Sequence, residues 1–366
     1  MREVREAQTG PLAHRGRIYG MRALFIREHG GLEKVSYGEV PPPELTDGNM
    51  VRVATRAAAL NHLDLFVVRG LPGIQLTMPH VLGSDASGEV EAVGSSAKRF
   101  KVGDKVMLNP LLSCGKCEFC LAGEHSQCVK VGIVGEHSQG TFAEQFVAPE
   151  ENLVSIPPGK TFEQAAAFSL VFQTAWRMLT TRGRVRAGED VLIHGIGSGV
   201  STAALQIAKL SGARVFVTSS SDEKLEKARA LGADFGYNYT NTDVAAEVLR
   251  ETGKRGVDLV VDSVGQETWA ASLKAVRRGG RIVTCGATTG PDPEASIHMI
   301  FWKQIEVIGS TMSSQSEYRE VVRLFGTGRL SPVIDRVFPL SQGGIALECL
   351  EAGQQFGKVV LTIGEN

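Results

Sequence analysis

Between about Phe162 and Ser310 the chain alternates apolar, strand-like runs with amphipathic, helix-like runs. The runs EDVLIHG, RVFVTSSS, VDLVVDSVG and GRIVTCGAT are typical of buried strands, whereas GVSTAALQIAKLSG and DEKLEKARALGA have the periodicity of helices. Strands that are apolar throughout and separated by helices favour a parallel sheet with helices on both faces. This alternation predicts a doubly wound α/β domain.

The segments on either side of that stretch follow a different pattern. From about Met21 to Ser155, short β-rich runs such as NMVRVATRAAAL and GTFAEQFVAP are separated by turns rich in Gly, Pro and Asp. The C-terminal runs PVIDRVFPL and GKVVLTIGEN return to β character. We therefore predict an α/β protein with a mostly antiparallel β domain interrupted by the doubly wound domain, with these ranges: 1–20 extension, 21–160 and 311–366 β domain, 161–310 doubly wound domain.

Composition narrows the functional class. The 366 residues carry a net charge of −1 and a pI near 6.7, which gives no electrostatic reason to expect nucleic acid or an anionic membrane as a partner. No run approaches the roughly 18 apolar residues of a membrane span. The first residues, MREVREAQTGPLAHRGRIYG, lack the apolar core of a signal peptide, so we expect a cytoplasmic protein that starts at Met1 or at Met21.

A metal site is predicted by the run CGKCEFCLAGEHSQC, which spans residues 114–128. Its spacing, C-x2-C-x2-C-x7-C, lets four thiolates surround one zinc ion at about 2.3 Å. Neighbouring cysteines at this spacing form disulfides poorly, and nothing marks the chain as secreted. Because protein would fill all four ligand positions, we predict one structural zinc per subunit, bound by Cys114, Cys117, Cys120 and Cys128. Cys285 and Cys349 are predicted to be free thiols.

The turn HGIGSGVS lies between a predicted strand and a predicted helix. Glycines at 195, 197 and 199 remove the β-carbons that would keep a pyrophosphate away, and the helix that starts near Gly199 would point free N–H groups at its charge. The G-x-G-x-x-G fingerprint is not met, because Val200 stands where no third glycine is present. In its strand–turn–helix context the turn nevertheless predicts a dinucleotide site.

The end of the second predicted strand bears on which nicotinamide cofactor binds. An acidic residue there would hold the ribose hydroxyl of NAD, but the chain has Thr218, Ser219, Ser220 and Ser221, with Lys224 one turn later. Hydroxyl groups and a cation suit the 2′-phosphate of NADP(H). Asp222 is the exception, and its position also suits a helix N-cap.

Taken together, these motifs resemble the medium-chain dehydrogenase/reductase superfamily. The resemblance rests on GSDASGEVEAVG, VGDKV, the four-cysteine lobe, GTFAEQFV, FQTAWRML and GIGSGVSTAALQIAK. It implies a GroES-like, mostly β catalytic domain and a Rossmann nucleotide-binding domain, with the active site in the cleft between them. It also implies a small-molecule substrate and a homodimer or homotetramer.

Zinc alcohol dehydrogenases of this superfamily hold a second, catalytic zinc on three ligands. At the matching positions this chain has Asn61, Ser84 and Leu170, which cannot supply the nitrogen, sulfur and carboxylate ligands that zinc prefers. Leu63 also replaces the hydroxyl residue that relays the alcohol proton in those enzymes. His62 and Asp85 lie beside these positions, and we expect neither to bind a metal.

The loss of these ligands resembles the quinone oxidoreductase and enoyl reductase branches, whose hydride transfer needs no Lewis acid. Asn61 is our candidate for the residue that lines the substrate oxygen, because its amide donates without titrating. Asp64 and Ser84 are further catalytic candidates. The resemblance assigns the carboxamide contact to Thr174 and the phosphate contacts to Ser219, Lys224 and Tyr239. The full predicted cofactor site is Thr174, Gly197, Ser198, Gly199, Val200, Ser219, Ser220, Lys224, Tyr239 and Val264.

The leading hypothesis is thus an NADPH-dependent oxidoreductase that reduces quinones or α,β-unsaturated carbonyl compounds without catalytic zinc. Two alternatives stay open. One is a zinc-type alcohol dehydrogenase or carbonyl reductase with atypical ligands. The other is a non-catalytic NADPH-binding redox sensor that kept the fold, because a fold does not determine a function.

Overall fold

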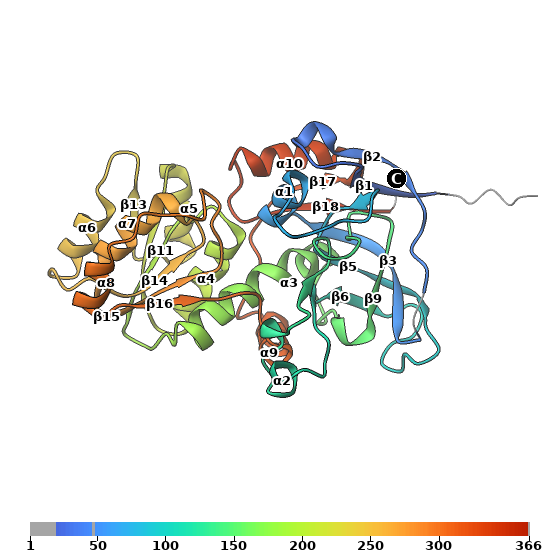
Figure 1. Ribbon diagram of the computed structural model, residues 1–366, viewed down its shortest axis with the longest axis horizontal. Coiled ribbons are helices and arrows are strands. Elements are labelled where there is room, and N and C mark those ends of the chain that lie inside the picture. Colours follow the sequence, from blue (N-terminus) through green and yellow to red (C-terminus); the bar gives the residue numbers. More distant parts are fainter. Residues whose placement is uncertain (1–19, 46–47, 365–366) are drawn as a thin grey trace, which may run out of the picture.

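A computed structural model of the chain describes residues 20–45 and 48–364. The predicted N-terminal extension therefore lies outside the described residues, apart from Gly20. Two lobes lie side by side in Figure 1, an α/β lobe around β11 to β16 and a β-rich lobe around β3, β5 and β18, with helix α3 between them. No described helix is long and apolar enough to cross a membrane.

The β-rich lobe is built on a seven-stranded sheet. Its strand order is β10-β6-β5-β3-β18-β17, and β9 pairs with another part of β3. All pairings are antiparallel except β17 with β18, which confirms the predicted mostly antiparallel domain. The strands are β3 (Met50–Ala59), β5 (Asp85–Val93), β6 (Lys105–Leu108), β9 (Gln145–Pro149), β10 (Leu153–Ser155), β17 (Ile334–Pro339) and β18 (Lys358–Thr362).

Two smaller sheets complete this lobe. One has the order β2-β1-β4 and the other pairs β7 with β8. Their strands are β1 (Met21–Ile26), β2 (Ser36–Val40), β4 (His80–Val81), β7 (Leu111–Leu112) and β8 (Gly132–Ile133). Because β17 and β18 join the sheet formed by β3 and β5, the C-terminal segment returns to the first domain as the sequence predicted.

The α/β lobe contains a six-stranded, fully parallel sheet of order β13-β12-β11-β14-β15-β16. The chain leaves β11 on one side toward β13 and returns to its other side at β14, so the topological switch point lies at β11. Ligands of such sheets bind at the carboxyl ends of the strands beside the switch point. The strands are β11 (Asp190–Ile193), β12 (Arg214–Ser219), β13 (Phe235–Asn238), β14 (Val257–Asp262), β15 (Val276–Thr284) and β16 (Glu306–Gly309).

Helix α3 connects the two lobes. It contacts β3, β5 and β18 on the β-rich side and α4 on the other, and Phe168 stacks on Phe172 and on Phe325 of α9. A boundary at residue 161 therefore falls just before a helix that both domains share. The described helices are α1 (His62–Arg69), α2 (Glu118–Leu121), α3 (Phe162–Trp176), α4 (Gly199–Leu210), α5 (Asp222–Ala230), α6 (Val244–Glu251), α7 (Gln266–Ala275), α8 (Ile297–Lys303), α9 (Gln315–Gly326) and α10 (Gly343–Glu351).

Candidate functional site

A cavity of about 760 Å³ is lined by residues of both lobes and includes the carboxyl end of β11. All ten residues of the predicted cofactor site line this one cavity. They come from α3, from the turn after β11, from the ends of β12, β13 and β14, and from the first turn of α5. The fold thus brings together side chains spread over about ninety residues of sequence, at the sheet edge where the switch point predicts a ligand.

The turn between β11 and α4 has the shape expected of a phosphate-binding turn. Ser198 is the N-cap of α4, and its Oγ accepts a hydrogen bond from the Ser201 amide at 3.1 Å. A β-carbon at Gly197 would lie 2.9 Å from Lys224 Nζ, and one at Gly199 would lie 2.8 Å from Lys358 Cδ. A side chain at either position would require Lys224 or Lys358 to move, so the two glycines leave the N-terminus of α4 accessible from the cavity.

The hydroxyl-rich end of β12 faces the same cavity. Ser219 and Ser220 line it together with Lys224 and Tyr239. Ser221, and not Asp222, is the N-cap of α5, because the Ser221 Oγ accepts the Lys224 amide whereas Asp222 is the first helical residue. Lys224 Nζ donates to the Gly353 carbonyl, and burial lowers the pKa of its ammonium group. One cation and three hydroxyl-bearing residues, Ser219, Ser220 and Tyr239, therefore line this part of the cavity.

A buried ion pair lies at the inner end of the cavity. Lys358, only 3 % exposed, donates from Nζ to Asn61 Oδ1 at 2.6 Å, to the Leu60 carbonyl at 2.7 Å and to Asp85 Oδ2 at 3.1 Å. Asp85 is fully buried, and its Oδ1 accepts the Leu170 amide at 2.9 Å. An ammonium group thus lies beside Asn61.

Asn61 lines the cavity, but its amide is engaged by the protein. Its Nδ2 donates to Asp85 Oδ2 at 2.9 Å and to the Ala59 carbonyl at 3.3 Å. The backbone N–H of Asn61 donates to Asp64 Oδ2 at 2.7 Å, which forms a capping box at the start of α1. A substrate oxygen could gain a hydrogen bond from this amide by replacing the longer contact, with Ala59.

The other two catalytic candidates lie behind the wall of the cavity. Asp64 is buried within α1, and burial raises the pKa of its carboxyl group to about 7 although the Asn61 amide and Lys358 oppose the shift. Ser84 is fully buried, and its Oγ has no hydrogen-bond partner within the described chain. Neither side chain lines the cavity. The structure therefore brings Asn61, Asp64 and Ser84 into one region but turns only Asn61 toward the open space.

Leu170 and Thr174 form the adjoining wall from α3. Both residues line the cavity, and Thr174 Oγ1 donates to the Leu170 carbonyl at 2.7 Å. His62, the first residue of α1, faces the same space. Burial and the positive charge of Lys358 lower the pKa of the His62 imidazole, which favours the neutral form.

The four cysteines of the lobe meet as predicted. Their sulfur atoms all lie within 4.8 Å of one another, a spacing that fits four thiolates around one zinc ion. The amides of Cys114 and Lys130 donate to Cys128 Sγ at 3.2 and 3.3 Å. All six cysteines of the chain are unbridged, which confirms the prediction that none forms a disulfide.

The lobe is anchored to the rest of the molecule by a buried arginine. Arg177, in the π-helical turn Arg177–Arg182 that follows α3, pairs with Glu124 of the lobe and with Glu317 of α9. Its side chain is 3 % exposed, so both carboxylates are needed to compensate its desolvated charge. The metal site and the helix between the two domains are therefore linked by one charged cluster.

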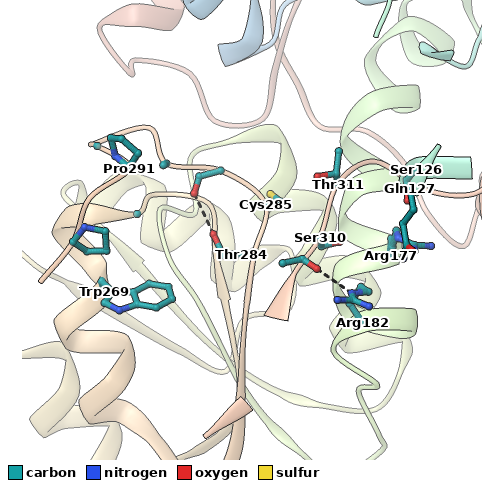
Figure 2. A pocket seen from close by; sticks show the side chains of 16 residues that line it. Ser126, Gln127, Arg177, Arg182, Trp269, Thr284, Cys285, Pro291, Ser310 and Thr311 are labelled. Atoms are coloured by element: carbon teal, nitrogen blue, oxygen red, sulfur yellow. Dashed lines mark hydrogen bonds between the residues drawn. The ribbon is translucent and has the colours of Figure 1, made fainter. Parts of the chain in front are cut away.

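Figure 2 shows a second cavity, also of about 760 Å³, between this lobe and the ends of β15 and β16. Arg177 and Arg182 lie on one side of it, and Trp269 and Pro291 lie on the other. It shares Cys285, Gly286 and Thr311 with the first cavity. Its wall combines segments that are far apart in the chain, from Ser126 to Thr311.

Two residues of the first cavity were missed by the sequence analysis. Lys358 is the first residue of the apolar strand KVVLT. A lysine at the start of a buried strand is the sequence signal that could have identified it. Glu136 lines the inner part of the cavity from the loop after β8. The surrounding sequence, GIVGEHSQG, contains no motif that would single out Glu136 as a site residue.

Comparison with known proteins gives consistent matches over both lobes. Residues 199–327 match the family model "Zinc-binding dehydrogenase", and residues 47–158 match "Alcohol dehydrogenase GroES-like domain". A zinc-type alcohol dehydrogenase-like protein of Schizosaccharomyces pombe is 34 % identical, covering 94 % of this chain and 99 % of that protein. A quinone oxidoreductase of Pseudomonas aeruginosa is also 34 % identical, with 93 % and 99 % covered. A solved NAD-dependent alcohol dehydrogenase is 46 % identical with a TM-score of 0.90, covering 94 % of this chain and 100 % of that one.

Proposed function

The chain belongs to the medium-chain dehydrogenase/reductase superfamily, among its zinc-type alcohol dehydrogenase-like and quinone oxidoreductase-like members, and on that premise we propose that it reduces quinones or α,β-unsaturated carbonyl compounds with NADPH and without a catalytic zinc. The family makes it an oxidoreductase that acts on small molecules. The substrate class, the choice of NADPH, the absence of a catalytic metal and a cytoplasmic location are the proposal.

One observation carries the metal-free part of the proposal, the ammonium group of Lys358 at 2.6 Å from Asn61 Oδ1. Asn61, Ser84 and Leu170 supply no ligand set for zinc. A buried cation beside them repels a divalent ion, since like charges in a poorly solvated site interact strongly. Over residues 20–45 and 48–364, the four-cysteine lobe is the one group of three or more His, Cys, Asp or Glu side chains close enough to share an ion.

The residues that line the cavity fit a dinucleotide with a reactive end near Asn61. The turn at Ser198 and the N-terminus of α4 would hold the pyrophosphate, and Thr174 would contact the carboxamide. When bound, the dihydronicotinamide supplies a hydride. Apolar side chains exclude water around the acceptor, and we propose that the Asn61 amide holds its oxygen. The apolar set is Leu63, Phe66, Leu71, Ile133, Leu170 and Met312.

The proposal is tested by mixing the purified protein with NADPH and a panel of quinones, enones and enoyl thioesters, and by counting zinc. We expect NADPH oxidation with at least one acceptor and one zinc per chain. If no compound of the panel causes NADPH oxidation although NADPH binds tightly, the result would instead indicate a non-catalytic sensor. Two zinc ions per chain would refute the metal-free site.

A specific rival is favoured by the 46 % identity to the NAD-dependent alcohol dehydrogenase. In that case the chain would oxidise alcohols with NAD and would need a metal at an atypical site. Alcohol oxidation that depends on a second zinc would support this rival, whereas quinone or enone reduction that survives with one zinc would exclude it.

The choice of NADPH is tested at Lys224. We expect Lys224→Ala to weaken NADPH binding about 10- to 100-fold, because a hydrogen bond between charged groups contributes roughly 1.5–3 kcal/mol. Binding of NADH, which lacks the 2′-phosphate, should change much less. Fluorescence titration with both cofactors measures the difference.

The matched control for this substitution is Lys227→Ala on the same helix, where the lysine is 46 % exposed and pairs with Glu223. We expect it to leave both affinities nearly unchanged. If Lys224→Ala weakened the binding of NADH as much as that of NADPH, Lys224 would serve to support the loop at Gly353 and would not bind the 2′-phosphate.

We also propose that the protein is a homodimer joined at the edge strand β16. This strand pairs only with β15 in the six-stranded sheet. Val307 on it and Ile297, Phe301 and Trp302 of the neighbouring α8 are exposed by 45–68 %. An exposed strand edge beside apolar side chains is a surface that a second copy would cover. Light scattering should give twice the chain mass; a monomer at micromolar concentration would contradict the proposal.

A further inference from the structure

Glu136 is one of two carboxylate residues of the described chain that line the cavity. It shares this surface with Leu63, Phe66 and Ile133. The only other carboxylate residue of the lining, Glu351, is 43 % exposed and pairs with Arg69. Glu136, by contrast, has a side chain that is 13 % exposed. A largely buried carboxyl group thus lines the cavity.

The backbone holds Glu136 close to the reaction region. The preceding residue, Gly135, has a φ of +84°, and a β-carbon on it would lie 2.2 Å from the Gly83 carbonyl and 3.2 Å from Ser84 Oγ. His80 Nε2 contacts the Gly135 carbonyl at 2.9 Å, which ties the loop to β4. The loop therefore packs directly on the Gly83–Ser84 segment, and Glu136 extends from that contact into the cavity.

No protein donor stabilises the charged form of this carboxyl group among the described residues. His137 Nδ1 lies 3.6 Å from a Glu136 carboxyl oxygen, but that nitrogen accepts the Ile133 amide at 3.2 Å. This nitrogen therefore carries no N–H that could donate to Glu136. Burial raises the pKa of Glu136, and a protonated His137 would only partly oppose this shift.

The charged and titratable groups of the neighbouring elements offer Glu136 no paired charge. Burial lowers the pKa of His62 on α1 and of His80 on β4, which favours their neutral forms. Lys358 of β18 is hydrogen-bonded to Asp85 of β5. Asp64 has a raised pKa as well, but it lies behind the wall of the cavity. Glu136 is thus the carboxyl group that both lines the cavity and has a pKa raised by burial.

We propose that Glu136 is the catalytic acid of this site and delivers the proton that completes the reduction of the substrate. The inference rests on the proposed function. For an enone, hydride addition forms a new C–H bond at the β-carbon. The electrons of the carbon–carbon π bond then shift toward the carbonyl oxygen, which gives an enolate. The O–H bond of Glu136 then breaks, its proton forms the second C–H bond at the α-carbon, and the carboxylate regains a proton from water at the cavity mouth.

The decisive variants are Glu136→Gln, which keeps the shape but has no acidic proton, and Glu136→Asp, which keeps the acid. We expect Glu136→Gln to lower kcat about 10²-fold or more, with NADPH affinity retained, because general acid catalysis contributes about 10²–10⁴-fold. Glu136→Asp should recover part of the rate. Wild-type kcat should fall as the pH rises through the pKa of Glu136, since the protonated acid is required, and this limb should vanish in Glu136→Gln.

An infrared measurement tests the same group without cofactor or substrate. At neutral pH the difference spectrum of wild type minus Glu136→Gln should contain the C=O band of a protonated carboxylic acid. Glu348→Gln, at an exposed carboxylate of α10 outside the cavity lining, should retain that band and the wild-type rate. A Glu136 that is ionised at neutral pH, or a Glu136→Gln variant within twofold of the wild-type kcat, would overturn the inference. If the proposed function is wrong, the wild-type protein itself will oxidise no NADPH, which distinguishes that failure from a failure of the role of Glu136. In that case the infrared band still tests whether Glu136 is protonated.

Discussion

Replacing Lys358 with methionine is expected to destabilise the fold by about 3–5 kcal/mol, the usual cost of removing one partner from a buried ion pair. Lys358 is 3 % exposed and Asp85 is fully buried, so the substitution would leave a carboxylate without its counter-charge. Asp85 would keep its hydrogen bonds from Asn61 and Leu170 but would lack a cation. The substitution also removes the ammonium group that we propose keeps zinc out.

Urea denaturation of Lys358→Met, Asp85→Asn and the double variant measures the coupling free energy between Lys358 and Asp85. Lys358→Met combined with Asp85→Asn should cost less than the sum of the single changes, by about 0.5–3 kcal/mol, because neither charge is then buried alone. Lys274→Met, at an exposed lysine of α7, is the control and should stay within about 0.5 kcal/mol of wild type. Strict additivity would show that Lys358 and Asp85 are not coupled.

Loss of the lobe zinc is the second large effect that we expect. Cys114→Ser removes one of four ligands, and structural zinc sites in isolated peptides bind with about 10–16 kcal/mol, so the lobe should lose its order. Glu124 would then no longer be held against Arg177, and a guanidinium group with a 3 % exposed side chain would keep only Glu317. We expect a lower melting temperature and weaker assembly, with cofactor binding retained because the nucleotide turn lies in the other domain.

Metal analysis and thermal melting check this result. Wild-type protein should contain one zinc per chain, and a chelator should lower its melting temperature toward that of Cys114→Ser. Cys349→Ser, at a buried thiol outside the lobe, should keep the zinc and most of the stability. A Cys114→Ser protein that is fully stable yet unable to transfer hydride would contradict a structural role.

Local patterns explain why much of the architecture was predictable. The parallel sheet follows from apolar runs such as EDVLIHG alternating with helices, and the observed β11 and α4 coincide with the predicted strand and helix. The zinc lobe follows from ligand spacing within fifteen residues. Both signals are short-range, so chain geometry alone limits what they can form.

The chemistry of the site was less predictable because it depends on residues far apart in the chain. Lys358 and Asp85 are 273 positions apart, and no periodicity relates them. Glu136 lies in a loop whose position is set by the contact of Gly135 with Gly83. The same contacts show that Asp64 and Ser84 lie behind the wall of the cavity, although their sequence neighbour Asn61 lines it.

The sequence by itself determined the two fold classes, the four-cysteine lobe and the glycine-rich turn, because each of these is encoded in neighbouring residues. Only the tertiary structure decided which groups surround Asn61 and which carboxyl groups line the cavity. Burial and charge pairing are properties of the packed chain, and they alone place the ammonium group of Lys358 beside Asn61 and raise the pKa of Glu136.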